Sequence, residues 1–234
     1  MKYINDDVGK DDADCAEDAV TSSALLEQRL EAIEDRIREL DPAAAGEKAA
    51  LQADAASILA DLSRGKEAWE LAREALETLI AEQNWEKATV ACLIMFHADQ
   101  PESLAALGQA IWLSVTFPVD PELTVAVMQN VVDETPDDSD GAAVAAVVAH
   151  YIVDLRAEAK QRDDLLFFTN NMIGNVARRH SDVSTQEKFD NWFSKLELDD
   201  PEKFLVRLRN IVDVMVQDEW WFDRDALQEA LPVN

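Results

Sequence analysis

The residues of this chain that come closest to a chemical site are a histidine and two carboxylates at helical spacing. His150 and Asp154 are four residues apart and Glu158 follows after four more, so on a helix all three would share one face. Imidazole and carboxylate groups gathered in this way can bind a metal ion or move protons. A second histidine at ligand spacing is missing, and an amphipathic helix carries the same residues. We therefore expect structural roles, and keep an enzyme or metal protein using His150 and nearby carboxylates as an alternative.

Motifs for nucleophilic or phosphate chemistry are absent from the sequence. There is no Gly-x-Ser-x-Gly, no glycine-rich phosphate loop and no Cys-x-x-Cys. A pair of catalytic carboxylates leaves no local signature, so the 48 acidic residues leave that possibility open. We predict no catalytic, cofactor-binding or metal-binding residues and expect that the protein is not an enzyme. His97 and His180 end helical patterns, where imidazole can meet free carbonyl groups.

Three adjacent aromatic residues near the C-terminus are the best candidates for contact with a partner. Trp220, Trp221 and Phe222 are bracketed by acidic side chains, and three neighbouring large side chains cannot all face one side of a helix. The segment either pins the C-terminal helix onto the rest of the protein or presents an aromatic anchor to a partner. The partner-binding residues that we predict are Trp220, Trp221, Phe222, His150 and Asp154.

The charge of the chain limits what its partners can be. It has 48 acidic and 21 basic residues and a formal net charge of −27. Residues 1–18 account for −5 of this, because they hold seven acidic side chains and two lysines, so the acidity belongs mostly to the rest of the chain. Such a surface disfavours direct binding to nucleic acid or anionic membrane and attracts a basic partner. It also permits a second hypothesis, an acidic nucleic-acid mimic that inhibits a DNA-binding protein.

Cysteine usage and apolar run lengths indicate a cytoplasmic protein. Cys15 lies in the acidic leader and Cys92 in an apolar run, so we expect no disulfide between them. The longest apolar stretch, residues 142–149, is too short to cross a bilayer, and Asp6 and Asp7 stand where a signal peptide would need apolar residues.

The elements that must position these residues are predicted to be helices. Only 6 glycines and 7 prolines interrupt 234 residues, far fewer than β-rich folds need. Helix starts are marked by polar residues followed by proline, and together with the breaks at Gly65 and Asn84 they predict about ten helices. The pairs are Asp41–Pro42, Gln100–Pro101, Asp120–Pro121, Thr135–Pro136 and Asp200–Pro201.

The first helix has a narrow apolar stripe that alternates spacings of four and three. The stripe consists of Leu26, Leu30, Ile33, Ile37 and Leu40, with Glu27, Glu31, Glu34 and Asp35 facing away from it. We expect this helix to pack on the next one; a dimerising coiled coil is the alternative, for which the heptads are few. Residues 142–149 should be central, because they are apolar on nearly every side.

The breaks recur at a fixed distance along the chain. Gly65 to Pro101, Pro101 to Asp137 and Asn84 to Asp120 are each 36 residues, which predicts helical hairpins of residues 66–82 with 85–97 and 102–116 with 122–131. Over residues 65–156 the sequence resembles tetratricopeptide-type repeat proteins, through Trp69, Ala72, Ala75, Leu76 and Ala88. The resemblance implies stacked hairpins with a concave groove.

We therefore predict an all-α fold in which helical hairpins stack as a short tetratricopeptide-like solenoid or an irregular bundle, followed by a C-terminal helical bundle. The predicted parts are a disordered acidic tail at residues 1–18, a repeat domain at 19–162, and the bundle at 163–234, which could be continuous with it. Trp69, Trp85 and Trp112 are expected in the core.

The leading functional hypothesis is a non-enzymatic interaction module, adaptor-like or chaperone-like, that holds a basic or amphipathic segment of another protein. Its basis is the hairpin rhythm together with the acidic surface.

Overall fold

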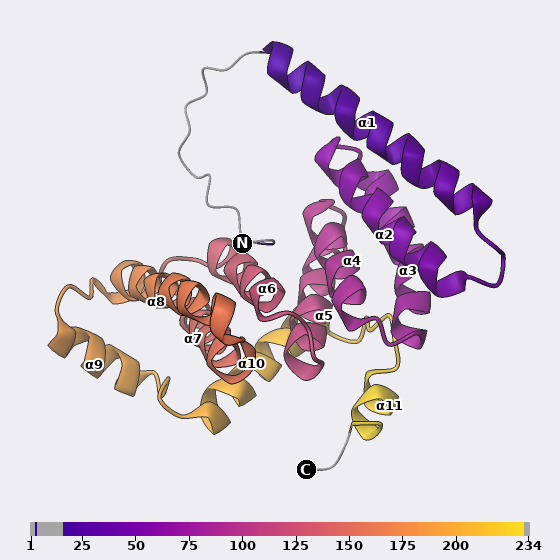
Figure 1. The fold of residues 1–234 in the computed structure, drawn as a ribbon. Helices are drawn as coiled ribbons and strands as arrows, with labels where there is room; N and C mark the ends of the chain where they lie inside the picture. The colour runs from indigo at the N-terminus through magenta and orange to yellow at the C-terminus, as the bar shows by residue number, and fades with distance from the viewer. Residues whose placement is uncertain (1–2, 4–15, 232–234) are drawn as a thin grey trace. The chain divides into compact units, whose positions relative to one another are not determined.

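The computed structural model describes residue 3 and residues 16–231 (Figure 1). Within that part of the chain there are eleven helices and no strand, so the all-α prediction is confirmed. Most of the predicted tail at residues 1–18 lies outside the described residues. None of the described helices combines bilayer length with the apolar character that a membrane crossing requires.

Short connections join the helices along the chain. In order they are α1 (Ala16–Glu39), α2 (Ala45–Asp61), α3 (Gly65–Ala81), α4 (Trp85–His97), α5 (Ser103–Thr116), α6 (Pro121–Glu134), α7 (Asp140–Arg156), α8 (Ala159–Ser181), α9 (Gln186–Lys195), α10 (Pro201–Val216) and α11 (Arg224–Glu229).

Polar side chains cap several helix starts, as the sequence predicts. The side chain of Asp120 accepts a hydrogen bond from the backbone NH of Glu122 at 2.9 Å, and Pro121 follows it as the first helical residue. Asn84 caps α4 through the NH of Lys87 at 3.3 Å. The prediction for the start of α7 is wrong, because the Thr135–Pro136 pair does not cap this helix. Its cap is Ser139, whose hydroxyl accepts a hydrogen bond from Gly141 NH at 3.1 Å.

Several helices end in the same backbone turn without glycine. Ser63, Gln83 and Glu197 have φ angles of 59°, 55° and 53°, which is the left-handed region. After α3, Gln83 NH donates to Ile80 O and Asn84 NH donates to Leu79 O, the paired bonds of a Schellman motif. This turn satisfies two free carbonyls of the helix end, but it holds an L-residue in a strained conformation.

We expect Gln83→Gly to raise the free energy of unfolding by about 0.5–1 kcal/mol. The strain of a non-glycine residue in this region is about 1–2 kcal/mol, and the extra freedom of glycine in the unfolded chain offsets part of it. Urea unfolding of the variant measures the gain. Glu77→Gly, at an exposed position inside α3, is the matched control and should lose about 1 kcal/mol. Equal effects of the two changes would contradict the strain argument.

The chain forms two compact units, named here after their place in the sequence. The central unit comprises Tyr3 and residues 114–214, and the terminal unit comprises the described residues 16–113 and 215–231. The boundaries lie inside α5 and α10, so each of these helices contributes to both units. Neither boundary coincides with the predicted division at 162/163, and an independently folding bundle at 163–234 stays a prediction.

The terminal unit is built by helices that pack in sequence. α1 packs on α2, α2 on α3 and α3 on α4, and α2 also contacts α4. The pair α3–α4 is the hairpin predicted at residues 66–82 and 85–97. Alanines such as Ala53, Ala72 and Ala88 are fully buried here, and their small side chains let the helix backbones approach closely.

The central unit repeats this pattern of contacts. α6 packs on α7 and α7 on α8, while α6 also contacts α8. All residues of 142–149 in α7 are buried, which confirms their predicted central position. The starts of α4 and α6, Trp85 and Pro121, keep the 36-residue spacing. The resemblance to tetratricopeptide repeats itself stays a prediction.

Candidate partner-binding groove on the first helix

Helix α1 is held against the terminal unit by the apolar stripe seen in the sequence. Leu30 at the centre of the stripe is 3% exposed, while Leu26, Ile33 and Ile37 on either side are half-buried. The helix contacts α2, as predicted for a first helix that packs on the next one. Most of its other described side chains are exposed, so α1 offers a long solvent-facing surface beside the stripe.

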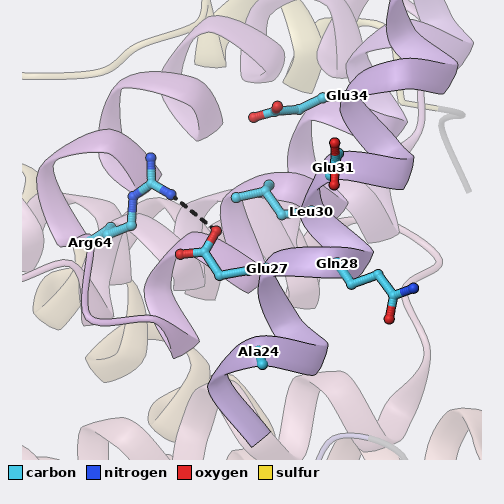
Figure 2. Close-up of a pocket in the computed structure, with 7 residues that line it drawn as sticks. All are labelled: Ala24, Glu27, Gln28, Leu30, Glu31, Glu34 and Arg64. Atoms are coloured by element: carbon cyan, nitrogen blue, oxygen red, sulfur yellow. Dashed lines mark ion pairs between the residues drawn. The ribbon is translucent and has the colours of Figure 1, made fainter. Parts of the chain in front are cut away.

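An open groove of about 620 Å³ runs beside this stripe (Figure 2). Leu30, almost fully buried, lies at the base of the groove, and carboxylates lie along one side of it. Figure 2 shows Glu27 and Arg64 pointing toward one another, with Glu31 and Glu34 further along α1. The lining residues are Ala24, Glu27, Gln28, Leu30, Glu31, Glu34 and Arg64.

The groove has an excess of negative charge. It is lined by three carboxylates and a single guanidinium, that of Arg64. Arg64 lies 3.7 Å from Glu27, but its shorter bonds go to Glu67, from Nε to Oε1 at 2.8 Å and from Nη2 to Oε2 at 2.6 Å. This bidentate bond raises the pKa of Arg64 and lowers the pKa of Glu67. Because Glu67 already pairs with the guanidinium, the groove carboxylates are only partly neutralised.

Two of these carboxylates are available to a partner. Glu31 and Glu34 are exposed, and within the described part of the chain neither takes part in an ion pair. A row of carboxylates next to an apolar residue can receive a segment that alternates lysine or arginine with apolar side chains. The groove is thus suited to binding such a segment, and its lining includes no serine, cysteine or histidine.

The sequence contains one signal for this site. Glu27, Glu31 and Glu34 have spacings of four and three, the same as the apolar stripe, so they form a second row along the helix. Arg64 had no such signal, because it comes from the connection between α2 and α3 and reaches the groove only through packing.

The structure gives His150 and its predicted companions different partners. His150 is half-buried, and its Nδ1 lies 3.0 Å from the hydroxyl of buried Thr169 on α8. Asp154 forms an ion pair with Arg162. Glu158 precedes α8 and lines a separate hollow with Lys160 and Asp164, among other residues. Among the described residues no group of three histidine, cysteine, aspartate or glutamate side chains is placed to hold a metal ion.

Burial lowers the pKa of His150, with a smaller opposing effect from Asp154. The folded state therefore disfavours the proton that the unfolded chain accepts near pH 6.5, the ordinary histidine pKa. We expect stability to be lost as pH falls from about 6.5 through the folded-state pKa. Urea midpoints at pH 8 and pH 5.5 should differ less for His150→Gln, whose amide can still reach Thr169, than for the wild type. If the midpoint changes equally with pH in the wild type and the variant, protonation of His150 does not destabilise the folded state.

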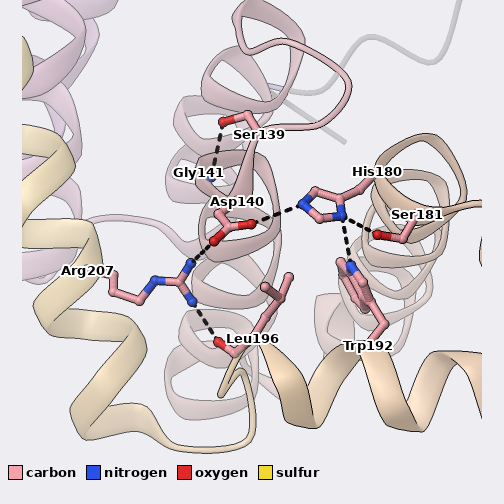
Figure 3. Close-up of polar contacts among 8 residues, drawn as sticks. All are labelled: Ser139, Asp140, Gly141, His180, Ser181, Trp192, Leu196 and Arg207. Atoms are coloured by element: carbon pink, nitrogen blue, oxygen red, sulfur yellow. Dashed lines mark hydrogen bonds and ion pairs between the residues drawn. The ribbon is translucent and has the colours of Figure 1, made fainter.

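His180 belongs to a polar network of the central unit (Figure 3). The indole Nε1 of Trp192 can only donate, and it donates to His180 Nδ1 at 3.1 Å. The neutral imidazole therefore has its proton on Nε2, which donates to Asp140 Oδ1 at 3.0 Å. Arg207 donates to the other oxygen of Asp140 at 3.0 Å and to Leu196 O at 2.6 Å.

This network holds helices of the central unit together. The Nδ1 lone pair, which a general base would need, is occupied by Trp192, and Ser181 Oγ lies 2.6 Å from the same nitrogen. His180 lies in the last turn of α8, as predicted, but its ring contacts Asp140 of α7 and Trp192 of α9. Together with Arg207 of α10 it ties four helices of the central unit.

The predicted aromatic anchor lies in an irregular segment between α10 and α11. Trp220, Trp221 and Phe222 are each half-buried, and all three contact aromatic residues of the terminal unit. Trp69, Trp85 and Trp112, expected in the core, are half-buried as well. These contacts favour the hypothesis that the segment pins the C-terminal region over the hypothesis that it presents an aromatic anchor to a partner.

Cys92 is not a candidate nucleophile. It is a fully buried free thiol on α4, and burial raises its pKa to about 12. A thiol becomes a nucleophile as the thiolate, which burial disfavours here.

Comparison with protein-family models, with curated proteins and with solved structures gave no match to this chain.

Proposed function

We propose that this protein is a non-enzymatic interaction module, adaptor-like or chaperone-like, that binds a basic amphipathic segment of a partner protein in the groove of α1. The observation that carries the proposal is the row of Glu27, Glu31 and Glu34 beside Leu30. Carboxylates would pair with lysine or arginine side chains, and the apolar lining at Ala24 and Leu30 would face an apolar side chain of the segment. A cytoplasmic location, expected from the sequence, belongs to the same proposal.

The charge of the whole chain supports the choice of a basic partner. A net charge of −27 creates a field that accelerates encounter with cations and repels other anions. The field acts on every basic protein, however, so specificity has to come from the groove.

Neutralising the groove should weaken binding of a basic amphipathic peptide by about tenfold, or about 1.4 kcal/mol. The variant is Glu27→Gln, Glu31→Gln and Glu34→Gln together. The probe is a labelled helical peptide with leucines on one face and lysines on the other, and fluorescence anisotropy at 50 and 200 mM salt measures its affinity. Affinity for the wild type should fall with salt, since exposed charges are screened.

A second triple variant controls for net charge. Glu77→Gln, Glu134→Gln and Glu187→Gln removes the same charge at exposed positions outside the groove. It should bind the peptide within about twofold of the wild type, because only long-range attraction is reduced. Equal weakening by the two triple variants would refute a groove-specific site.

Capture of a natural partner, followed by challenge with duplex DNA, addresses the hypothesis of a nucleic-acid mimic, which stays a prediction. A mimic needs several carboxylate rows spaced like phosphates, and it must compete with duplex DNA for a DNA-binding protein. If a partner is captured and a short duplex does not displace it, the mimic hypothesis fails and the interaction module stands. Displacement by DNA together with indifference to the groove variant would favour the mimic.

A further inference from the structure

The segment after α10 is held on the terminal unit by one buried amide. We name residues 217–223 the C-terminal strap. The side chain of Gln109 on α5 is fully buried; its Oε1 accepts from Trp221 NH at 3.0 Å, and its Nε2 donates to Glu219 O at 3.4 Å. A single side chain thus pairs with the backbone of two strap residues, i and i+2, much as a neighbouring strand would.

Aromatic and cationic side chains of the same unit flank this amide. Trp69 of α3 meets Trp221 edge to face at 5.5 Å between ring centroids, and the guanidinium of Arg73 lies 5.0 Å from the Trp221 ring centroid. Trp112 of α5 contacts Trp220 at 5.7 Å and Phe222 at 5.6 Å. We name Trp69, Arg73, Gln109 and Trp112 the strap receptor.

The receptor holds the features of a site for an extended peptide. Gln109 forms hydrogen bonds with the backbone, and the aromatic rings offer flat surfaces to the side chains. Sites for extended peptides combine these two kinds of contact. If the strap leaves, the Gln109 amide loses a backbone donor at Oε1 and a backbone acceptor at Nε2, and another extended backbone restores both hydrogen bonds. The strap itself has no regular structure, and its three aromatic side chains are half-buried.

The base of the strap is anchored where α10 ends. A Cβ on Gly108 would lie 2.6 Å from Val216 Cγ2, so the end of α10 is in close contact with α5. The next residue, Gln217, has a φ of 53°, a strained conformation for a non-glycine residue. Opening at Gln217 would release the strap and leave the contact of Val216 in place.

We propose that the strap receptor is a second binding site, for an extended partner segment with adjacent aromatic residues flanked by carboxylates, and that the chain's own strap occupies it until such a segment displaces it. The chemistry of the ligand follows from the strap, since Glu219–Trp220–Trp221–Phe222–Asp223 is the sequence seen in place. The site is distinct from the groove of α1 and takes an acidic ligand, so the two proposals can fail separately.

The test uses the full chain and a labelled peptide of residues 217–225. Trp221→Ala, which removes the contacts with Trp69 and Arg73, should bind this peptide at least tenfold more tightly than the wild type does. Adding Gln109→Ala should abolish that gain. A peptide with alanine in place of its three aromatic residues has the same charge and should not bind. Circular dichroism checks that the variants keep their helix content.

Hydrogen exchange of the wild type provides a measurement that does not depend on any variant folding. Excess unlabelled peptide should speed exchange at the amides of residues 217–223, because the strap is displaced, while α3 and α5 stay protected. Unchanged strap exchange, together with no binding to Trp221→Ala, would show that the strap is only a structural fastening. Peptide binding that survives Gln109→Ala would place the peptide elsewhere and would also overturn the proposal.

Discussion

Replacing Arg156 by alanine should lower the free energy of unfolding by about 3 kcal/mol. Arg156, at the end of α7, donates from Nη1 to Ser114 O at 2.8 Å and to Phe117 O at 2.9 Å, and from Nη2 to Val115 O. These carbonyls belong to the end of α5, where a helix leaves its last carbonyl groups without internal partners. The guanidinium is half-buried, and this burial lowers its pKa, so water cannot fully replace it.

Equilibrium unfolding in urea measures this loss. Arg156→Lys should recover only part of it, because an ammonium group lacks the planar fork that reaches several carbonyls at once. Arg178→Ala is the matched control: Arg178 is exposed on α8 and bonds only to Asn175 among the hydrogen bonds described, so its loss should stay within about 0.5 kcal/mol. A loss below about 1 kcal/mol for Arg156→Ala would contradict the capping role.

Gly65→Ala should cost about 2 kcal/mol. A Cβ at this position would lie 2.8 Å from the carbonyl oxygen of Ala98, a backbone atom at the end of α4. Ala98 is 5% exposed, so relief of the clash requires the end of α4 to move away from α3. The usual benefit of alanine in a helix is therefore outweighed by the clash.

Gly174→Ala distinguishes this clash from a general effect of glycine. Gly174 lies inside α8, and a Cβ there would meet nothing closer than the Arg178 guanidinium at 3.6 Å. We expect this change to stabilise the protein by about 0.5–1 kcal/mol, as alanine does in a helix interior. Thermal unfolding of both variants gives the comparison, and a stabilising Gly65→Ala would refute the close approach.

Local signals explain why the helices could be predicted from the sequence. Asp120–Pro121 and Asn84 act through residues two or three positions away, so the printed sequence contains the whole interaction. The all-apolar run at 142–149 predicted burial on every side, and burial follows. The cap of α7 is an exception: the pair Thr135–Pro136 gives the stronger sequence signal, but Ser139, four residues later, makes the capping hydrogen bond.

Long-range pairing explains why the sites could not be predicted in full. Gln109 and Trp221 are 112 residues apart, and nothing in the pattern around Gln109 shows that a backbone NH will approach it. His150 and Asp154 were correctly placed on one helix, but their partners Thr169 and Arg162 come from α8, and these contacts decide their roles. Periodicity predicts which residues share one face of a helix, but it does not predict which residues of other helices contact that face.

Capture of a partner by the intact protein tests the central claim most directly. The wild type, the groove variant (Glu27→Gln, Glu31→Gln, Glu34→Gln) and the control variant (Glu77→Gln, Glu134→Gln, Glu187→Gln) are used as baits in native extract at low and moderate salt, and bound proteins are quantified by mass spectrometry. We predict a protein with a basic amphipathic segment that is retained by the wild type and the control, weakened by salt, and lost with the groove variant. Equal retention by all three baits would contradict the proposal that the groove of α1 is the partner-binding site.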